Sequence, residues 1–382
     1  MPYAAERIMH DADSHVMETR EWMEPFLDES APPNMRSLYG KDKNRIDGLL
    51  DQAKARKGDS VAEKTAAEDP IAGPKGWSAY GAFDGNERSK ALDTLGFKTQ
   101  LVFSTSSIGP LLRAKTEEHL YQGTRAHNQA MVSFCRADPR LLGVGYVPLD
   151  NIERAVEEAT FAIDAGCKAI QVFAGPRGGR SPGHTDNDAF WALLCDKNIP
   201  FMLHIGPGTI TQHKDYHNNG RTRAPDLHGG GENLRFPDYA MLAYAPQNFL
   251  IAMIYDGVFE RFPTLRGGVI EAGAAWVPGF LRQVDFAYKG FRKTDKYLGE
   301  LSMQPSDYIR RAIKFTPFPG ENAGEIIQQG GGDLFMFSSD YPHPEGTNDP
   351  LGRFEHYLDE ISEEDKEKFY RSNYEEMMGL GN

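Results

Sequence analysis

The sequence predicts an α/β fold, a (β/α)8 TIM-like barrel with a charged insertion near the N-terminus. Eight short apolar segments alternate with helical stretches, and most of these segments run without alternation of polar and apolar residues. Fully buried parallel strands with helical crossovers have this pattern. A chain of 382 residues has room for eight such units, so we assign residues 1–382 to one barrel domain. A doubly wound open sheet is the alternative arrangement of the same elements.

The first strand is expected to end in the polar stretch 11–15, because Ile8 and Met9 lead into it. Residues 41–76 follow as a highly charged segment with few large apolar residues after Leu50. Segments of this composition cannot bury much surface. We therefore interpret 41–76 as a solvated insertion that either lies on the surface or closes over the site as a lid.

Strand-like and helical segments then alternate to the C-terminus. Helices are predicted where apolar residues recur at spacings of three and four, and strands where short apolar runs stop at Pro, Gly or polar residues. The predicted helices are 88–95, 116–137, 152–165, 188–198, 239–262 and 276–288. The predicted strands after the first are 99–104, 142–147, 169–173, 200–203, 268–270, 313–316 and 334–337.

The composition narrows the classes of function. A net charge of -13 argues against binding nucleic acid or an anionic membrane through bulk charge, and no apolar run approaches the length of a membrane span. Residues 1–7 lack a basic region followed by an apolar core, so no secretory signal is expected. Three widely spaced cysteines indicate reduced thiols in a cytoplasmic protein. We expect a small-molecule substrate and a homo-oligomer, dimer or higher.

Polar residues that can bind metal follow four of the predicted strands. Asp13 and His15 alternate and so share one side of a strand, and His204, Glu271 and Asp340 each follow an apolar run. The carboxyl ends of barrel strands open on one face, where these groups can converge on a divalent ion. Each residue also has a structural interpretation: a cap and a surface His at 13–15, a core His at 204, an ion pair to an Arg at 271, and a helix cap at 340.

The same motifs resemble those of the amidohydrolase superfamily. The resemblance rests on Asp-x-His at 13–15, His204, EAGAAWVP at 271–278 and SSDYPH at 338–343. More narrowly, these motifs and GVFERFP at 257–263 resemble the amidohydrolase-related branch that includes aminocarboxymuconate semialdehyde decarboxylase and the hydroxybenzoate decarboxylases. The resemblance covers nearly the whole chain except 41–76.

The resemblance implies one divalent ion, Zn²⁺ or Mn²⁺, with four ligands. By position in the motifs these are Asp13, His15, His204 and Asp340. The fourth predicted strand ends without the lysine that binuclear relatives carry, so a single metal is favoured.

One departure from the branch favours hydrolysis. The decarboxylases carry a catalytic His after the sixth strand, where this chain has Glu271. A glutamate does not serve as a neutral-pH imidazole, but it can be a further ligand or a general base. The leading prediction is hydrolysis by water activated at the metal, with Asp340 and Glu271 as catalytic residues and Asp340 moving the proton. The alternative is non-oxidative decarboxylation, in which Asp340 protonates carbon.

Further histidines and several aromatic residues are candidates for contact with the substrate. His343 is predicted to bind substrate or to supply an imidazole, as is a histidine of the long loop (His213, His217 or His228). Aromatic residues near the predicted site suit a planar or aromatic substrate, although aromatics more often belong to a core: Trp22, Trp77, Phe173, Trp276 and Phe318. A metal-binding barrel without catalysis is the third hypothesis, because a fold alone does not establish activity.

Overall fold

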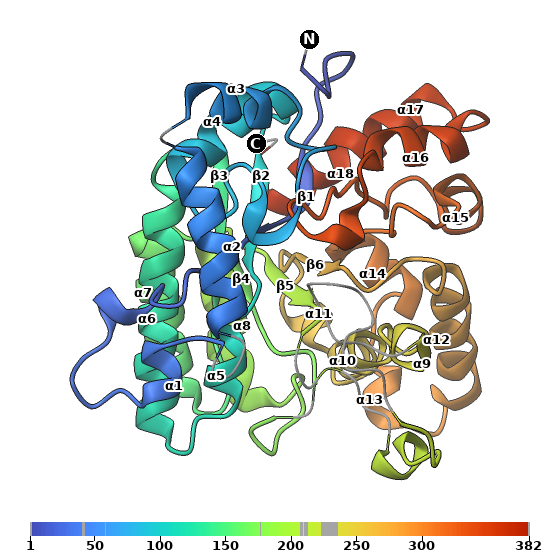
Figure 1. Cartoon of the computed structure of the whole chain (residues 1–382). Coiled ribbons are helices and arrows are strands. Elements are labelled where there is room, and N and C mark those ends of the chain that lie inside the picture. Colours follow the sequence, from blue (N-terminus) through green and yellow to red (C-terminus); the bar gives the residue numbers. More distant parts are fainter. Residues whose placement is uncertain are drawn as a thin grey trace. The chain divides into compact units, whose positions relative to one another are not determined.

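The computed structural model describes residues 2–39, 43–57, 59–175, 177–206, 209, 213–222 and 236–380. The chain divides into two compact units, each built from parallel strands and helices (Figure 1). The first unit comprises Met1–Pro148, Glu157–Gln171 and Phe337–His356. The second comprises Leu149–Val156, Val172–Met336 and Tyr357–Asn382.

The first unit contains four parallel strands that neighbour one another in chain order. They are β1 (Asp11–Val16), β2 (Gln100–Ser104), β3 (Leu141–Tyr146) and β4 (Ala169–Gln171). Its helices are α1 (Pro33–Arg36), α2 (Lys43–Arg56), α3 (Ser60–Glu68), α4 (Gly85–Leu95), α5 (Ile108–Leu112) and α6 (Glu117–Cys135), with the larger part of α7 (Ile152–Ala165) and of α16 (Pro350–Leu358). Short 3-10 turns lie at Glu24–Phe26, Gly76–Ser78 and Pro344–Gly346.

The second unit contains the parallel strands β5 (Phe201–His204), β6 (Gly267–Ile270) and β7 (Ile313–Phe315), again in chain order. Its helices are α8 (Asp188–Asp196), α9 (Phe236–Tyr239), α10 (Tyr244–Tyr255), α11 (Val258–Arg261), α12 (Val277–Phe291), α13 (Lys296–Gly299), α14 (Pro305–Ala312), α15 (Ala323–Gly330), α17 (Glu363–Glu367) and α18 (Asn373–Met378). Turns at Thr185–Asn187 and Lys214–His217 are 3-10, and Lys368–Ser372 forms a π turn.

Strand β3 is buried along its whole length and shows why small residues are needed beneath α6. A Cβ at Gly143 would lie 3.0 Å from Cγ of Met131, and one at Gly145 would lie 3.1 Å from Oδ1 of Asn128, both in α6. Helix and strand therefore approach more closely than a side chain on either glycine would permit.

The predicted first strand differs from the observed one in position. The polar stretch itself forms β1, and all six of its residues are buried. Ile8 is half exposed and precedes the strand. The polar residues are tolerated inside because they bond to one another and to neighbouring segments, as described below.

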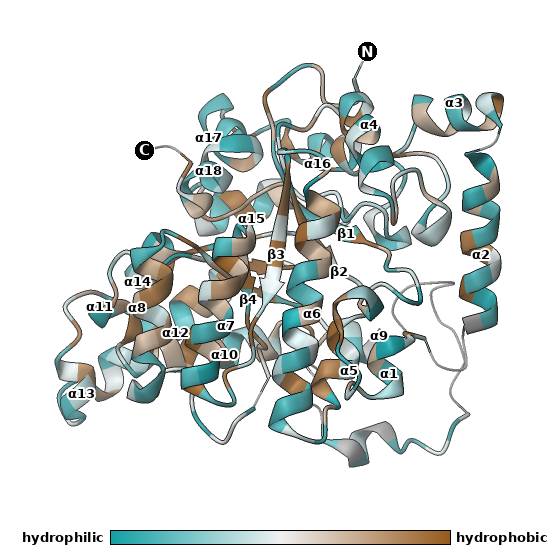
Figure 2. Ribbon diagram, turned by 90° about the vertical axis from the view of Figure 1, so that its left-hand side faces the viewer, coloured by the Kyte–Doolittle hydropathy of each residue, from teal (hydrophilic) through white to brown (hydrophobic). Residues whose placement is uncertain are grey.

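The charged segment 41–76 is largely helical where the structure describes it. Helix α2 is mainly hydrophilic (Figure 2), but it buries Ile46, Leu50 and Ala53 at helical spacing. Asp59 caps α3 by accepting the backbone N–H groups of Val61 and Ala62. In the described part of this segment, α2 therefore packs an apolar stripe against the first unit, while α3 buries no residue. A role as a lid stays a prediction.

Two predicted elements are wrong in detail. The helix expected over 239–262 is interrupted, because Gly257 takes a φ of 72° and begins α11 as a separate turn. The strand expected over 334–337 is reduced to an isolated bridge between Phe315 and Phe335. Its ladder is incomplete because the carbonyl of Phe335 accepts the side-chain amide of Asn373 at 2.8 Å.

Candidate metal centre

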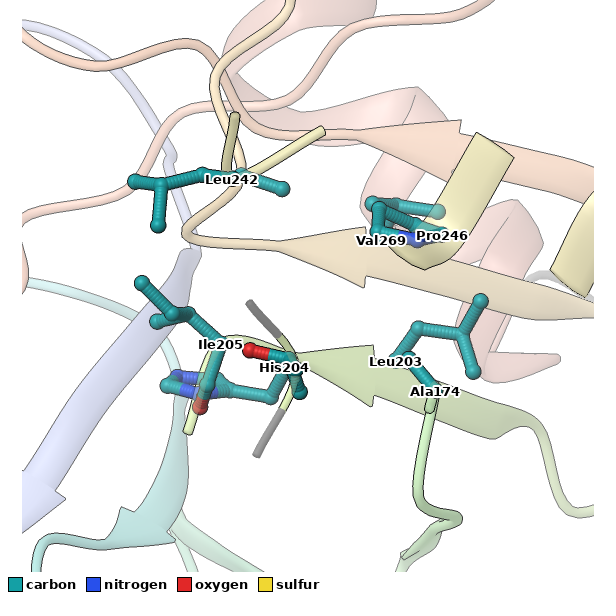
Figure 3. A pocket seen from close by; sticks show the side chains of 9 residues that line it. Ala174, Leu203, His204, Ile205, Leu242, Pro246 and Val269 are labelled. Atoms are coloured by element: carbon teal, nitrogen blue, oxygen red, sulfur yellow. The ribbon is translucent and has the colours of Figure 1, made fainter. Parts of the chain in front are cut away.

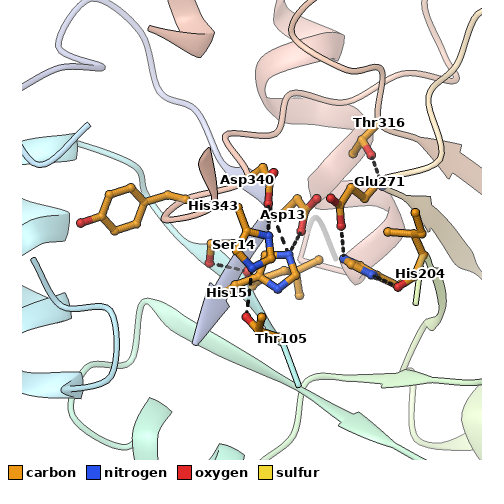
Figure 4. Close-up of polar contacts among 12 residues, drawn as sticks. Asp13, Ser14, His15, Thr105, His204, Glu271, Thr316, Asp340 and His343 are labelled. Atoms are coloured by element: carbon orange, nitrogen blue, oxygen red, sulfur yellow. Dashed lines mark hydrogen bonds and ion pairs between the residues drawn. The ribbon is translucent and has the colours of Figure 1, made fainter. Parts of the chain in front are cut away.

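Strand β1 and the segment around Asp340 form a buried cluster in the first unit (Figure 4). Nε2 of His15 lies 3.3 Å from Oδ1 of Asp13 and 3.4 Å from Oδ1 of Asp340. Nδ1 of His343 lies 3.0 Å from the same Asp340 oxygen. Each of His15, Asp340 and His343 offers a ligand atom, and these three atoms lie within 4.8 Å of one another. Asp13, His15, Asp340 and His343, all predicted from sequence, are therefore brought together.

Asp340 is held in an unusual backbone conformation. Its φ is 53°, in the left-handed region, and its N–H donates to the carbonyl of Asp13 at 2.9 Å. Such a conformation costs about 1–3 kcal/mol in a residue other than glycine and persists where the surroundings enforce it. Oδ1 of Asp340 is buried and makes no hydrogen bond among the described residues. A buried carboxylate oxygen of this kind suits a cation.

Asp11 enforces that conformation and was missed as a site residue. Its carboxylate accepts the N–H of Ser339 at 2.8 Å, the hydroxyl of Ser339 at 2.6 Å and the side-chain amide of Gln100 at 2.7 Å. Burial raises the pKa of Asp11 to about 7, although these hydrogen bonds lower it. The alternation of Asp11 with Asp13 and His15 was the available signal.

Hydrogen bonding assigns the protons of His343. The hydroxyl of Thr105 donates to the carbonyl of Val16 at 2.9 Å, so its oxygen accepts from Nε2–H of His343 at 3.0 Å. Nδ1 of His343 then faces the Asp340 carboxylate at 3.0 Å. A proton added to either atom would face the other across this distance.

Glu18 also stabilises this arrangement, and it was not predicted from the sequence. Its buried carboxylate accepts the backbone N–H groups of Thr105, Ser106 and Ser107 and the hydroxyl of Ser107. Burial raises the pKa of Glu18, although these hydrogen bonds lower it. Glu18 fixes the turn after β2 that carries Thr105. Its sequence position, three residues after His15, gave no signal of this role.

His15 is suited to be a ligand because it is neutral at neutral pH. Burial, together with the neighbouring His343, lowers the pKa of His15 from 6.5 to about 4. A metal binds the neutral imidazole, so no proton has to be removed at physiological pH.

The second unit presents His204 and Glu271 as a second buried pair. Nε2 of His204 lies 3.3 Å from Oε2 of Glu271. Nδ1 of His204 lies 2.7 Å from the carbonyl of Ile205, and since a carbonyl only accepts, Nδ1 carries the hydrogen. Nε2 of the neutral ring is therefore the ligand atom. Glu271 has a φ of 55° and its N–H donates to Oγ1 of Thr316 at 3.1 Å. The alternative pairing of Glu271 with an arginine stays a prediction.

A small pocket beside His204 has a mainly apolar lining, to which Thr209 adds a polar side chain. Figure 3 shows Leu203, Ile205, Leu242 and Val269 around it. Its volume of about 10 Å³ is close to the space of one water molecule. The lining therefore leaves room for little more than one water molecule beside the His204 ring.

The remaining predicted residues, which are the loop histidines and the aromatic residues, make the following contacts where the structure describes them. His213 is exposed and accepts the N–H of Asp215, while the side chain of His217 and the whole of His228 lie outside the described residues. Trp77 donates to the carbonyl of Glu18, and Trp276 packs edge-on against Phe315. Among the other aromatics, Trp22 contacts His127, Phe318 contacts Tyr239 and Phe173 lines a cavity described below.

A family model described as Amidohydrolase matches residues 103–380. The chain belongs to this amidohydrolase family. The match confirms the superfamily inferred from the motifs. No curated protein sequence matches that of this amidohydrolase.

Solved structures confirm the fold of this amidohydrolase. An amidohydrolase from Mycobacterium avium subsp. paratuberculosis K-10 is 21% identical, with 98% of this chain and 100% of that chain covered and a TM-score of 0.73. A 2,6-dihydroxybenzoate decarboxylase from Rhizobium is 19% identical over 77% of this chain and 88% of that chain, with a TM-score of 0.60. A 5-carboxyvanillate decarboxylase from Novosphingobium aromaticivorans DSM 12444, solved with bound manganese, is 18% identical over 100% of both chains, with a TM-score of 0.65.

These likenesses, with the parallel strands and helices of each unit, confirm the α/β barrel class that the sequence predicted. No helix in the described part of the chain combines the length and apolar character needed to cross a bilayer.

Proposed function

We propose that this amidohydrolase is a metal-dependent decarboxylase of small aromatic carboxylates. This proposal differs from the leading prediction from the sequence, which was hydrolysis. The observation that carries the reversal is the 3.3 Å contact between Glu271 and His204. A free, ionised Glu271 would repel a substrate carboxylate and would therefore favour hydrolysis. Because the Glu271 carboxylate lies beside Nε2 of His204, the proposed ligand atom, a divalent ion bound there would offset its charge and weaken that objection to a carboxylate substrate. The decarboxylases among the solved relatives support the proposal.

Asp13, His15, His204 and Asp340 are the proposed ligands of one divalent ion, Mn²⁺ or Zn²⁺. The residues fit such an ion: His15 is held neutral by burial, Nδ1 of His204 is committed to a carbonyl, and Oδ1 of Asp340 is buried without a hydrogen bond. In a parallel barrel the strand ends that carry these residues open on one face, which is the basis for assigning both clusters to one centre. The mixed nitrogen and oxygen set suits either metal, and one solved relative holds manganese.

The residues of the first unit supply the proton chemistry. A divalent ion bound there would act as a Lewis acid that holds and polarises the substrate carboxylate. Asp340 donates a proton to the ring carbon that bears the carboxylate, and His343 returns a proton to Asp340 across their 3.0 Å contact. The bond between ring and carboxyl carbon then breaks, its electron pair restores the aromatic ring, and CO₂ leaves. Thr105 keeps Nε2–H of His343 fixed, so Nδ1 faces Asp340 throughout.

A second candidate is hydrolysis of an amide or ester. One observation favours it: the resembling decarboxylases carry His where this chain has Glu271. In that case Asp340 would accept a proton from the attacking water and return it to the leaving group.

Mass spectrometry of the manganese-loaded protein with paired substrates tests the proposal. Each pair is a hydroxylated aromatic carboxylate and its neutral amide. We expect loss of one CO₂ from carboxylates, abolition of this activity by a chelator and recovery with Mn²⁺. Gain of one water or cleavage of the amides, without loss of CO₂ from any carboxylate, would replace the decarboxylase with the hydrolase.

A further inference from the structure

A second cavity lies within the second unit, between the segment after β4 and helix α10. Its volume is about 300 Å³, within the range of pockets that hold small ligands. It is lined by Phe173, Arg177, Arg180, Asn187, Phe249 and Ala252, among others. None of the proposed metal ligands or catalytic residues lines it. It shares Ala174 and no other lining residue with the small pocket beside His204.

The cavity combines an apolar wall with two guanidinium groups. Leu149, Phe173 and Phe249 supply flat, apolar surface. Nε of Arg177 donates to Asp150 at 2.6 Å, and Nη1 of Arg180 donates to Asp186 at 3.2 Å. Those carboxylates are not among the residues that line the cavity, so they fix the arginines without presenting negative charge to its interior. Guanidinium groups fixed in this way are suited to binding a carboxylate.

Two buried polar atoms of the lining residues lack hydrogen-bond partners among the described residues. Nε of Arg180 is a donor without an acceptor. Asn187 is 2% exposed, and its Nδ2 donates to the carbonyls of Ser181 at 3.0 Å and Pro182 at 3.2 Å. Because carbonyls only accept, this contact fixes the orientation of the amide, and Oδ1 of Asn187 is left buried without a donor. Both atoms are covered by surrounding protein atoms, so contacts with a ligand would come from the accessible parts of the lining side chains.

We propose that this cavity is a second ligand site, lined by none of the proposed metal ligands, for a small aromatic carboxylate. The carboxylate would be held by Arg177 and Arg180, and the ring would lie against Phe173 and Phe249. The proposal rests on the cavity alone and holds whichever reaction the metal centre catalyses.

Isothermal titration calorimetry with benzoate, 4-hydroxybenzoate and benzamide tests this site. Ala252→Leu fills the cavity with a good helix former, and Ile251→Leu is the matched control at the next position of α10, outside the lining. Arg180→Gln is a second test that does not depend on packing. We expect Ala252→Leu and Arg180→Gln each to weaken benzoate binding by at least about tenfold, and Ile251→Leu to leave it unchanged. Benzamide should bind more weakly than benzoate, because it lacks the negative charge that the two arginines would hold.

Three results would overturn the site. One is the absence of saturable binding of either acid to the wild-type protein. Another is wild-type affinity for benzoate in both Ala252→Leu and Arg180→Gln. The third is benzoate binding that survives Ala252→Leu but is lost in His204→Ala, which would place the acid at the metal centre.

Discussion

At the residue scale, Asp340 combines a left-handed backbone with a buried carboxylate that contacts His343. Asp340→Asn keeps an oxygen for the metal but removes the exchangeable proton, and asparagine tolerates a positive φ. We expect metal content to survive in part and turnover to fall by at least about 10²-fold, the usual size of a general acid–base contribution. Metal analysis and rates of CO₂ release measure both. Turnover near that of the wild type, with metal bound, would assign proton transfer to another group.

His204 is the proposed ligand from the second unit, and its role predicts metal retention. His204→Ala should leave a folded protein whose metal affinity falls by more than the 10–100-fold typical of changes to residues that support ligands. His213→Ala is the control, because this exposed histidine makes a local contact with Asp215. Metal analysis after dialysis compares the two variants. Full metal content in a folded His15→Ala/His204→Ala protein would refute the ligand assignment.

Glu271 separates the two candidate reactions. If an ion bound at the neighbouring Nε2 of His204 offsets its charge, Glu271→Gln should not raise activity toward a carboxylate relative to its neutral amide. If the charge instead faced the substrate at about 4 Å, the repulsion would be on the order of 4 kcal/mol at an effective dielectric near 20, and removing it would favour the carboxylate strongly. Values of kcat/KM for both substrates in both proteins decide. A large gain for the carboxylate in the variant would restore the hydrolase.

At the scale of elements, helix α4 is tied to the first strand through one buried arginine. Arg88 donates to the carbonyls of Gly81 at 2.8 Å and His15 at 2.6 Å, and its guanidinium lies 4.9 Å from the ring centre of Tyr341. Its contacts thus reach the backbone of one proposed ligand and the residue after another. Burial lowers the pKa of Arg88, yet an arginine stays charged at any physiological pH.

Replacing Arg88 should therefore destabilise the fold and loosen the site together. Arg88→Met leaves two buried carbonyls without this donor, at a cost of about 1–3 kcal/mol each in the free energy of unfolding. Lys90→Met is the control on the same helix, because Lys90 makes an exposed ion pair with Glu63 that should contribute less than about 1 kcal/mol. Urea unfolding with metal analysis measures both effects. Equal stability of the two variants would contradict this role of Arg88.

At the scale of the whole molecule, buried histidines make stability depend on pH. Burial lowers the pKa of His127 from 6.5 to about 3, while Nδ1 contacts the hydroxyl of Ser107 at 2.8 Å. Between these values the unfolded chain binds a proton that the folded protein does not. The stabilisation is complete above pH 6.5 and is lost as the pH falls toward 3.

The metal-free protein should accordingly lose stability on acidification below about pH 6.5, by up to about 1.4 kcal/mol per pH unit for each such histidine. His127→Gln cannot titrate and should flatten this dependence. Chemical unfolding between pH 7 and pH 4, in the presence of a chelator, measures the slope. An unchanged slope in the variant would show that other groups dominate acid unfolding.

The sequence by itself determined the class of fold and most of the proposed site. Runs such as 201–203 and Gly267–Ile270 are apolar throughout, and a polar residue directly after such a run must lie at the carboxyl end of a buried sheet. Alternation alone placed Asp13 and His15 on one side of β1. These inferences hold because they depend on local periodicity, which the sequence displays directly.

Only the tertiary structure decided how these residues are supported and paired. Asp11 bonds Ser339, 328 residues away, and Glu18 bonds the turn after β2, 87 to 89 residues away. The contact of Glu271 with His204, which turned the proposed reaction from hydrolysis to decarboxylation, likewise joins separate strands. The interruption at Gly257 and the loss of the strand at 334–337 to Asn373 have the same origin. Hydrogen bonds between distant segments have no periodicity along the chain, so the fold had to bring the partners together before they could be identified.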